Sequence, residues 1–304
     1  MLKQITASGN NYQCGLALGR TLAKETRQRL NLLKITPQRL ARHRSQLTIV
    51  HQLCENHYPQ YLQELRGMAD GAQVDYWLLF FLNCPDLNLG RHGCSSIAIN
   101  KADQLLLAHN EDNEPYEQKD FCTLAHLTIN GHTMHAFYYA GELIGGAFGW
   151  NQHGLATTIN YVRALEQNPI AMSKYFTARA LLDTTDPQQA LETIKNIPNA
   201  SGYHYYLANH EQILSVEHTP THVSSQRVQS VDFHTNHYLH PDLTQKVPAS
   251  KHSLTRLRRI QDMLSQNILP LEILFDCQNR PNSCLLYTSP SPRDRTRSRM
   301  PSSA

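Results

Sequence analysis

The strongest candidate for chemistry in this chain is a cysteine that directly follows a glycine. Cys94 stands after Gly93, and the apolar run that begins there is followed by a polar turn and by a second run ending in Asn110 and Asp112. Two apolar runs joined by a short polar turn are typical of a β-hairpin. Such a hairpin brings an amide and a carboxylate close to the Gly93–Cys94 peptide bond, which suits a thiol that cleaves its own chain. The alternative is an ordinary buried thiol, the usual setting of a free cysteine.

The register of this hairpin decides which side chains reach the thiol. With the loop at 101–102, paired residue numbers sum to about 203, so Cys94 is expected to face His109. Gly93 then faces Asn110. A slip of one residue would move every side chain to the other face of its strand.

The segments around the hairpin must hold it in place, and their order predicts the fold class. Up to residue 90, apolar residues at helical spacing predict helices that begin near residues 12, 37 and 59. From 94 to about 160 the pattern changes to strands, with a strong turn signal at Asn130-Gly131. Further helices are expected at 173–182, 186–197 and 253–264, and further strands at 203–207 and 212–217. Segregated helices and strands predict α+β layers rather than alternating βαβ units.

The composition limits the classes of function. A chain of 304 residues can bury a large core. No apolar run approaches the ~20 residues that span a bilayer, and the N-terminus lacks the apolar core of a signal peptide. Seven cysteines with no C-x-x-C pair indicate neither a disulfide framework nor a zinc ribbon. We therefore expect a reducing, cytoplasmic compartment and no membrane partner.

The C-terminal residues 284–294 (C-L-L-Y-T-S-P-S-P-R-D) resemble the translation of an adapter used in DNA sequencing libraries. We therefore expect three segments: 1–93, 94–283 with the natural sequence cut short near Ser283, and a non-native tail at 284–304. The tail carries four arginines and one aspartate, a net charge of +3, and the whole chain is also +3, so the remainder is about neutral. This balance gives no support for a nucleic acid partner.

Several motifs, taken together and in order, resemble those of one enzyme family. They are Gly9–Gly19 (G-N-N-Y-Q-C-G-L-A-L-G), Glu64–Ala72, Gly93–Ser96 with Asn110–Asp112, Gly149–Leu155 with Asn160, and His234–Tyr238 (H-T-N-H-Y). The sequence resembles the isopenicillin N acyltransferase family over residues 9–282. This family is a branch of the N-terminal nucleophile hydrolases and includes carcinine and β-alanyl-amine hydrolases.

The resemblance implies a four-layer αββα sandwich of the N-terminal nucleophile hydrolase type and a precursor that cleaves itself between Gly93 and Cys94. The two segments are expected to stay associated. The freed α-amino group of Cys94 would serve as general base, because an α-amine titrates at about 7.7–8.0. The implied reaction passes through a thioester on Cys94, with a small-molecule amide as substrate and no cofactor.

The family's other site residues carry over onto five positions. Asp112 matches the carboxylate required for processing, which would hold the new ammonium or orient the thiol; its alternative is a turn or helix-cap aspartate. Asn236 matches the oxyanion-stabilising asparagine, and its alternative is a loop asparagine bonded to its own backbone. Asn110 is expected to line the binding site, and its alternative is a structural role. Ser253 and Arg256 resemble a Ser-x-x-Arg region of the binding site, against the alternative of a solvated helix face.

One residue departs from the fungal members of the family. Glu111 stands between Asn110 and Asp112, where fungal members usually have an aromatic residue. This departure favours a linear N-acyl or aminoacyl amide over the penicillin precursor, with hydrolysis favoured over acyl transfer.

Two other functions stay open. A metal-dependent hydrolase could use the histidines of His234-x-x-His237-x-x-His240 or His132-x-x-His135, although residues three apart on a strand point to opposite faces. An inactive, truncated scaffold is the second.

Overall fold

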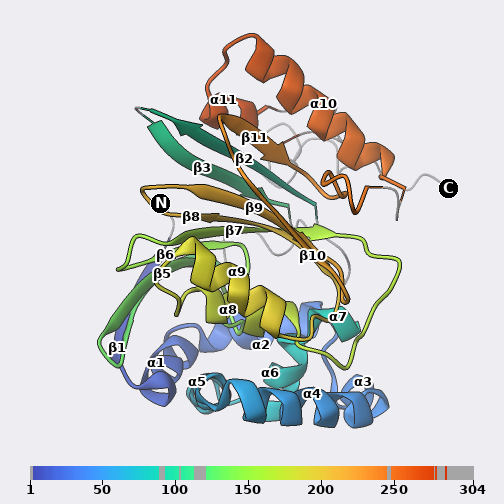
Figure 1. Cartoon of the computed structure of the whole chain (residues 1–304). Helices are drawn as coiled ribbons and strands as arrows, with labels where there is room; N and C mark the ends of the chain where they lie inside the picture. The colour runs from blue at the N-terminus through green and yellow to red at the C-terminus, as the bar shows by residue number, and fades with distance from the viewer. Residues whose placement is uncertain are drawn as a thin grey trace, which may run out of the picture.

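The computed structural model describes residues 3–88, 93–102, 104–112, 121–244 and 248–276, together with Gln278 and Leu285. Two β-sheets pack face to face, and helices cover both outer faces (Figure 1). The α10 and α11 helices lie on the small sheet, and the other helices gather on the far side of the large sheet. The predicted four-layer αββα sandwich is confirmed. Apart from Leu285, the adapter-like tail at 284–304 lies outside the described residues.

The large sheet has eight strands in the order β1-β4-β5-β6-β7-β8-β9-β10. Their bounds are β1 (Lys3–Gly9), β4 (Cys122–Ile129), β5 (His132–Tyr139), β6 (Phe148–Asn151), β7 (Ala156–Val162), β8 (Gly202–Ala208), β9 (Ile213–His218) and β10 (Val223–Arg227). Neighbours are antiparallel except β1 and β4, which run parallel. The sequence did not predict β1. The structure places β1, which precedes Cys94 in the chain, in the same sheet as strands that follow Cys94.

The small sheet has the order β11-β2-β3 and contains the predicted hairpin. Its strands are β2 (Cys94–Lys101), β3 (Gln104–Glu111) and β11 (Val231–His234). Cys94 pairs with Glu111, not with His109 as predicted, because the first strand continues to Lys101, which pairs with Gln104. The predicted pairing was therefore wrong by two residues. A shift of two keeps each side chain on its face, so His109 and Glu111 both share the face of Cys94.

The helical layer before Cys94 contains seven helices among the described residues. They are α1 (Asn11–Thr21), α2 (Ala23–Leu32), α3 (Pro37–Arg42), α4 (Arg44–His57), α5 (Pro59–Ala72), α6 (Tyr76–Leu82) and α7 (Pro85–Asn88). The α1 helix begins with a capping box, in which Asn10 and Gln13 each accept a hydrogen bond from the other's backbone N–H. The apolar run at 76–82, which has no clear period, forms a helix because Asp75 caps its N-terminus.

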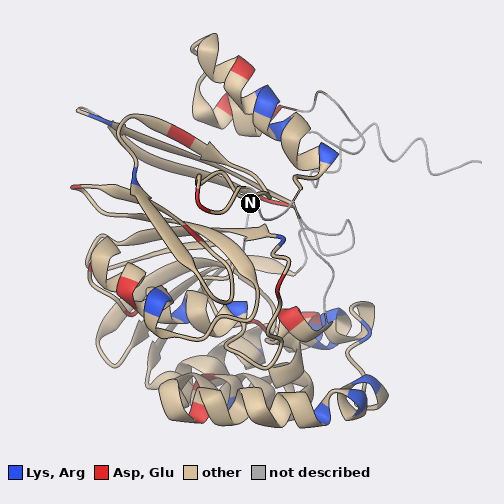
Figure 2. Cartoon of the chain, turned by 45° about the vertical axis from the view of Figure 1, so that its right-hand side comes forward, with Lys and Arg blue, Asp and Glu red and all other residues tan. Residues whose placement is uncertain are grey.

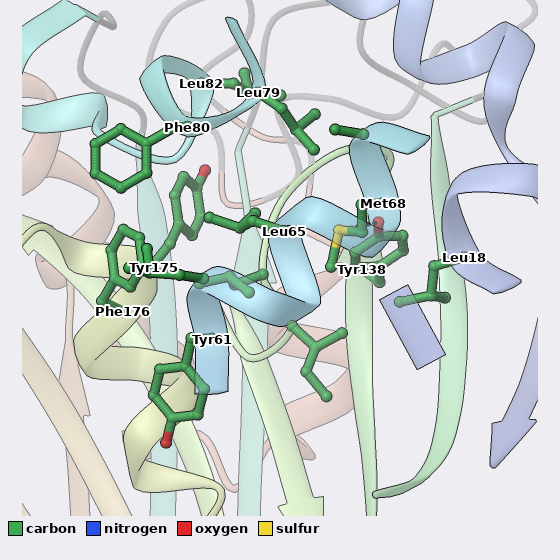
Figure 3. Packing of buried hydrophobic residues seen from close by; sticks show 14 of the residues in the cluster. Leu18, Tyr61, Leu65, Met68, Leu79, Phe80, Leu82, Tyr138, Tyr175 and Phe176 are labelled. Carbon is green, nitrogen blue, oxygen red and sulfur yellow. Dashed lines mark hydrogen bonds between the residues drawn. The ribbon is translucent and has the colours of Figure 1, made fainter. Parts of the chain in front are cut away.

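Two of the family-like motifs form one helix–helix contact. A Cβ atom added to Gly15 of α1 would lie 2.0 Å from the Glu64 carbonyl oxygen of α5, and one added to Gly67 would lie 2.1 Å from the Tyr12 carbonyl oxygen. Only glycine allows the two backbones to approach this closely. Leu18 of α1 and Leu65 and Met68 of α5 then contribute to the core between the helices and the large sheet (Figure 3).

The remaining helices are α8 (Lys174–Leu181), α9 (Pro187–Asn196), α10 (Lys251–Ser265) and α11 (Pro270–Leu274). Asp186 caps α9 and Pro187 occupies its first turn, so the helix lies within the predicted range 186–197. Charged residues lie mainly on helices, and the sheets carry few of them (Figure 2). Glu111, the last residue of β3, is one of these exceptions. No helix in the described part of the chain is both long and apolar enough to cross a membrane.

Candidate active site

Two hydrogen bonds hold the peptide bond between Gly93 and Cys94. The backbone N–H of Asp112 donates to the Gly93 carbonyl oxygen at 2.7 Å. The backbone N–H of Cys94 donates to Asn236 Oδ1 at 3.0 Å. Together the two contacts fix the orientation of this peptide group.

The space beside this bond is too small for a side chain on residue 93. A Cβ atom at Gly93 would lie 2.8 Å from Asp112 Oδ2 and 3.2 Å from Arg256 Nη2. A side chain on residue 93 would therefore require the Asp112 carboxylate or the Arg256 guanidinium to shift.

The Cys94 thiol is buried, with 1% of the residue exposed. Its Sγ donates to Glu111 Oε2 at 3.2 Å. Burial, reinforced by the negative charge of Glu111, raises the pKa of the Cys94 thiol well above its usual value. The thiol is thus protonated at neutral pH, and ionising it needs a proton acceptor.

Glu111 is surrounded by positive or hydrogen-donating groups. Its Oε2 lies 3.1 Å from His109 Nε2, and its Oε1 lies 3.9 Å from Lys174 Nζ, at the start of α8. Burial opposes ionisation of Glu111, but Lys174 and His109 outweigh it and hold the pKa of its carboxyl below the usual value. Glu111 is therefore a carboxylate at neutral pH.

A hydrogen-bonded chain connects this carboxylate to the large sheet. His109 Nδ1 lies 2.8 Å from Ser96 Oγ, and Ser96 Oγ donates to Asn160 Oδ1 on β7 at 2.6 Å. Asn160 Nδ2 in turn donates to the His234 carbonyl oxygen at 3.4 Å. This series of hydrogen bonds fixes the orientation of the His109 ring. It also gives a structural role to Asn160, which is one of the residues in the family-like motifs.

Asn236 and Ser253 form the other wall of the site. Asn236 Nδ2 donates to the Tyr161 carbonyl oxygen at 2.8 Å, which orients the amide with its oxygen toward Cys94. The backbone N–H of Asn236 donates to Ser253 Oγ at 2.8 Å. Ser253 thereby holds the loop that carries Asn236, and it is fully buried.

Arg256 contacts the backbone of Cys94. Its Nη1 donates to the Cys94 carbonyl oxygen at 2.5 Å and to Ser95 Oγ at 2.7 Å, and its Nη2 donates to Asn236 Oδ1. Asp112 Oδ2 is 3.9 Å from Nη1 and balances the buried guanidinium. The residue is only 5% exposed, so it does not belong to a solvated helix face.

The structure brings together most of the residues that the sequence singled out. Gly93, Cys94, Asp112, Asn236 and Arg256 are joined by direct hydrogen bonds or an ion pair, and Ser253 bonds to Asn236.

Asn110 lies elsewhere. Its Nδ2 donates to the carbonyl oxygens of Leu274 and Leu285, at 2.6 and 2.7 Å, on the opposite face of β3 from the thiol. Its position in the strand explains this, because Asn110 pairs with Ser95 while Cys94 pairs with Glu111.

Three residues of this site were given no chemical role from the sequence: Glu111, His109 and Lys174. His109 was expected to face Cys94, and the alternation along β3 places Glu111 on the same side as the thiol. Lys174 comes from a helix 80 positions further along the chain than Cys94, and nothing in the sequence marks it.

The histidines considered as metal ligands do not converge on one another. His234 Nε2, His237 Nδ1 and His240 Nδ1 bond to different partners: Glu217, Ser253 and Ser224. His132 Nε2 bonds to the Leu182 carbonyl oxygen, whereas His135 Nδ1 bonds to His126.

Another group has spacing that would allow a metal ion. Cys94, His109 and Glu111 place one donor atom each within 4.8 Å of one another. Glu111 Oε2 already takes part in hydrogen bonds with both other groups, and the Lys174 ammonium disfavours a second cation beside the carboxylate. In this structure the three groups are joined by hydrogen bonds.

A family model described as acyl-coenzyme A:6-aminopenicillanic acid acyl-transferase matches residues 99–293. The chain is 28% identical over 220 residues to the beta-alanyl-dopamine/carcinine hydrolase of Drosophila melanogaster, covering 62% of this chain and 56% of that protein. It is 24% identical over 226 residues to the acyl-coenzyme A:6-aminopenicillanic-acid-acyltransferase 40 kDa form of Emericella nidulans, covering 71% and 63%. The chain thus spans little more than half of the first of these relatives.

Among solved structures, that of penicillin V acylase from Agrobacterium tumefaciens is similar with a TM-score of 0.31 and 10% identity, covering 60% of this chain and 52% of that one.

Proposed function

Because the chain belongs to the acyl-coenzyme A:6-aminopenicillanic acid acyl-transferase family, we propose that it is a self-processing enzyme whose nucleophile is the thiol of Cys94. The observation that carries this proposal is the way the Gly93–Cys94 peptide bond is held. Its carbonyl oxygen accepts a backbone hydrogen bond from Asp112 at 2.7 Å, and its N–H donates to Asn236 Oδ1 at 3.0 Å. The first contact continues the ladder between β2 and β3, whereas the second comes from a side chain 142 positions further along the chain.

In the self-cleavage, Cys94 Sγ attacks the carbonyl carbon of Gly93. The oxygen that becomes negatively charged is the one that already accepts from the Asp112 N–H, so charge develops where a donor is in place. The C–N bond breaks, and the Gly93 acyl group is held as a thioester on sulfur until water hydrolyses it. The new α-amino group then lies beside Asn236 Oδ1 and near the ion pair of Asp112 with Arg256.

In the mature enzyme the freed α-amine of Cys94 takes the thiol proton as the sulfur attacks a substrate amide. Asn236 supplies an oxyanion donor through Nδ2, which has two hydrogens, one of them directed to the Tyr161 carbonyl oxygen. The Arg256 bond to the Cys94 carbonyl oxygen keeps the new N-terminal residue in place. The reaction needs no cofactor in this proposal.

The substrate class we propose is a small linear amide, either N-acyl or aminoacyl, with water as the preferred acceptor. The two relatives named above are a beta-alanyl-dopamine/carcinine hydrolase and an acyltransferase. Glu111 supports the former class, because an anionic carboxylate beside the thiol suits a substrate that carries an amino group.

Turnover of a panel of N-acyl and aminoacyl amides by the purified protein tests this function. Mass spectrometry of the acid-quenched reaction should reveal acylation of the segment that contains Cys94, and Cys94→Ser should lose the acyl thioester. Cys122→Ala, in the large sheet, is the matched control and should keep both. Turnover that persists in Cys94→Ser would contradict the proposal.

A further inference from the structure

The self-cleavage step lacks the base that the mature enzyme has. Before cleavage, the nitrogen of Cys94 is part of a peptide bond, so its lone pair is delocalised and cannot accept a proton. The thiol is buried, and its pKa is raised well above the usual value, chiefly by burial. A different group must take the proton when sulfur attacks Gly93.

The hydrogen bond made by the thiol identifies a candidate. Cys94 Sγ donates to Glu111 Oε2 at 3.2 Å. The groups that face this carboxylate are His109 on its own strand, Cys94 on β2 and Lys174 on α8, with the Asp112–Arg256 pair nearby. Lys174 and His109 keep Glu111 ionised and therefore able to accept.

The hydrogen atoms in the bonds that run from His109 through Ser96 to Asn160 can be counted. Asn160 Nδ2 donates to the His234 carbonyl oxygen, so its Oδ1 is the acceptor for Ser96. The Ser96 hydroxyl uses its single hydrogen in that bond, and it must therefore accept from His109 Nδ1–H.

His109 Nε2 then faces Glu111 with the other ring nitrogen already protonated. Ser96 and Asn160 thus hold the His109 ring in one geometry, with Nε2 at 3.1 Å from Glu111 Oε2.

We propose that Glu111 is the proton acceptor for the Cys94 thiol during self-cleavage and that His109 is the residue that positions it. The Sγ–H proton passes to Glu111 Oε2 as the Sγ–C bond to Gly93 forms. The same proton then passes to the Cys94 nitrogen as the C–N bond breaks, leaving a thioester and a free amine. Water hydrolyses the thioester, and Glu111 ends in its starting state.

Forming the Sγ–C bond makes the transfer feasible for a weakly basic carboxylate. Sulfur becomes positively charged as it bonds to carbon, so its proton becomes far more acidic than in the free thiol. A free thiolate is not required at any stage.

Glu111→Gln tests the role directly, and this inference rests on the proposed self-cleavage. The chain is made by cell-free translation, and the fraction cleaved is followed over time. General-base catalysis contributes about a hundredfold or more, so the Gln variant should cleave at least about a hundred times more slowly than the natural chain. Glu111→Asp should retain part of the rate. Glu192→Gln, at an exposed position on α9, should cleave normally.

The pH profile separates a proton acceptor from a structural residue. In the natural chain the cleavage rate should fall on the acidic side as Glu111 becomes protonated, and Glu111→Gln should lose this limb. Glu111→Ala should regain part of its rate with added formate. His109→Gln should keep the acidic limb but displace it, since its effect on the acceptor is indirect.

The outcomes distinguish the two proposals. If the natural chain cleaves and Glu111→Gln cleaves equally fast with an unchanged profile, the role of Glu111 is refuted and self-processing stands. If the natural chain does not cleave at all, the proposed function itself fails. A Gln variant that is slow yet keeps the acidic limb would assign Glu111 a structural role only.

Discussion

At the residue scale, the central feature is that four side chains from distant parts of the chain meet at one peptide bond. Cys94, Asp112 and Asn236 were predicted to be catalytic, and Arg256 to bind substrate. The structure places all four in contact around Gly93. Their roles in catalysis and in substrate binding stay predictions.

Gly93→Ala should slow self-cleavage strongly while leaving the fold intact. The added Cβ would lie 2.8 Å from Asp112 Oδ2, so either the carboxylate or the scissile bond must shift. A displacement near 1 Å can cost about a hundredfold in rate. The fraction cleaved over time, together with the melting temperature, checks this; normal cleavage would show that the site tolerates the displacement.

Asn236→Asp should separate the two functions of this residue. The variant keeps an oxygen for the Cys94 N–H, so self-cleavage should continue, but it loses the Nδ2 donor. Removing one oxyanion donor costs about a hundredfold or more in kcat. Steady-state kinetics of the cleaved protein provides the measurement. Near-normal kcat with a raised KM would reassign Asn236 to substrate binding.

The sequence singled out Cys94 as the proposed nucleophile but did not identify all of the side chains that surround it. Asn110 and Glu111 are neighbours on β3, and a strand sends neighbouring side chains to opposite faces. Glu111, which the sequence linked only to the choice of substrate, is therefore the residue beside the thiol. Asn110 instead bonds to Leu274. Lys174 could not be found from sequence, since only tertiary packing brings α8 to this site.

At the element scale, two motifs act by packing. Gly15 and Gly67 allow α1 and α5 to contact through their backbones. Near this contact, Glu64 of α5 is fully buried and accepts from Arg179 of α8 at 3.1 Å. These elements set the helical layer on which the large sheet rests (Figure 3).

Gly67→Ala should destabilise the protein by separating these helices. Its Cβ would lie 2.1 Å from the Tyr12 carbonyl oxygen, which belongs to a helix backbone and cannot rotate away. Overpacking of this kind costs about 1–3 kcal/mol or more. Urea unfolding measures the loss, and Gln63→Ala on the exposed side of α5 should change stability by no more than about 0.5 kcal/mol. Equal stability of the two variants would contradict the close helix contact.

Replacement of Arg179, the buried cation that pairs with Glu64, should destabilise the protein more than Gly67→Ala does. In Arg179→Met the Glu64 carboxylate would lose its buried partner, and burial already raises the pKa of that carboxyl. Breaking such a pair from one side costs about 3–5 kcal/mol. The double variant Arg179→Met/Glu64→Gln should recover part of the loss in the same urea assay, whereas no recovery would show that the loss does not come from the unpaired Glu64 carboxylate.

The order of the elements was largely predictable, but the first strand was not. In β1 only Ile5 and Ala7 are buried apolar residues, so the alternating pattern is too short to stand out. The strand forms because it pairs in parallel with β4, more than 110 residues later in the chain. A contact of that range leaves no local signal.

At the scale of the whole molecule, the large sheet contains strands from both sides of the proposed cleavage point. The β1 strand, from before Cys94, forms its edge beside β4, and α1 to α7 cover its outer face (Figure 1). The segment 1–93 therefore shares one core with the segment that follows.

The two cleaved segments should accordingly remain together in native buffer. Size-exclusion chromatography should give one peak that contains both, and denaturant should be required to separate them. The parallel pairing of β1 with β4 and the shared core supply the physical reason. Segments that separate without denaturant would show that this core does not hold them.

The most direct test of the account is the mass of the expressed protein. We predict two polypeptides, the second of which has Cys94 as its N-terminal residue by sequencing, and a single uncleaved chain for Cys94→Ala. A natural chain that stays in one piece and still hydrolyses amides would contradict the central claim, because its Cys94 nitrogen would never become the base.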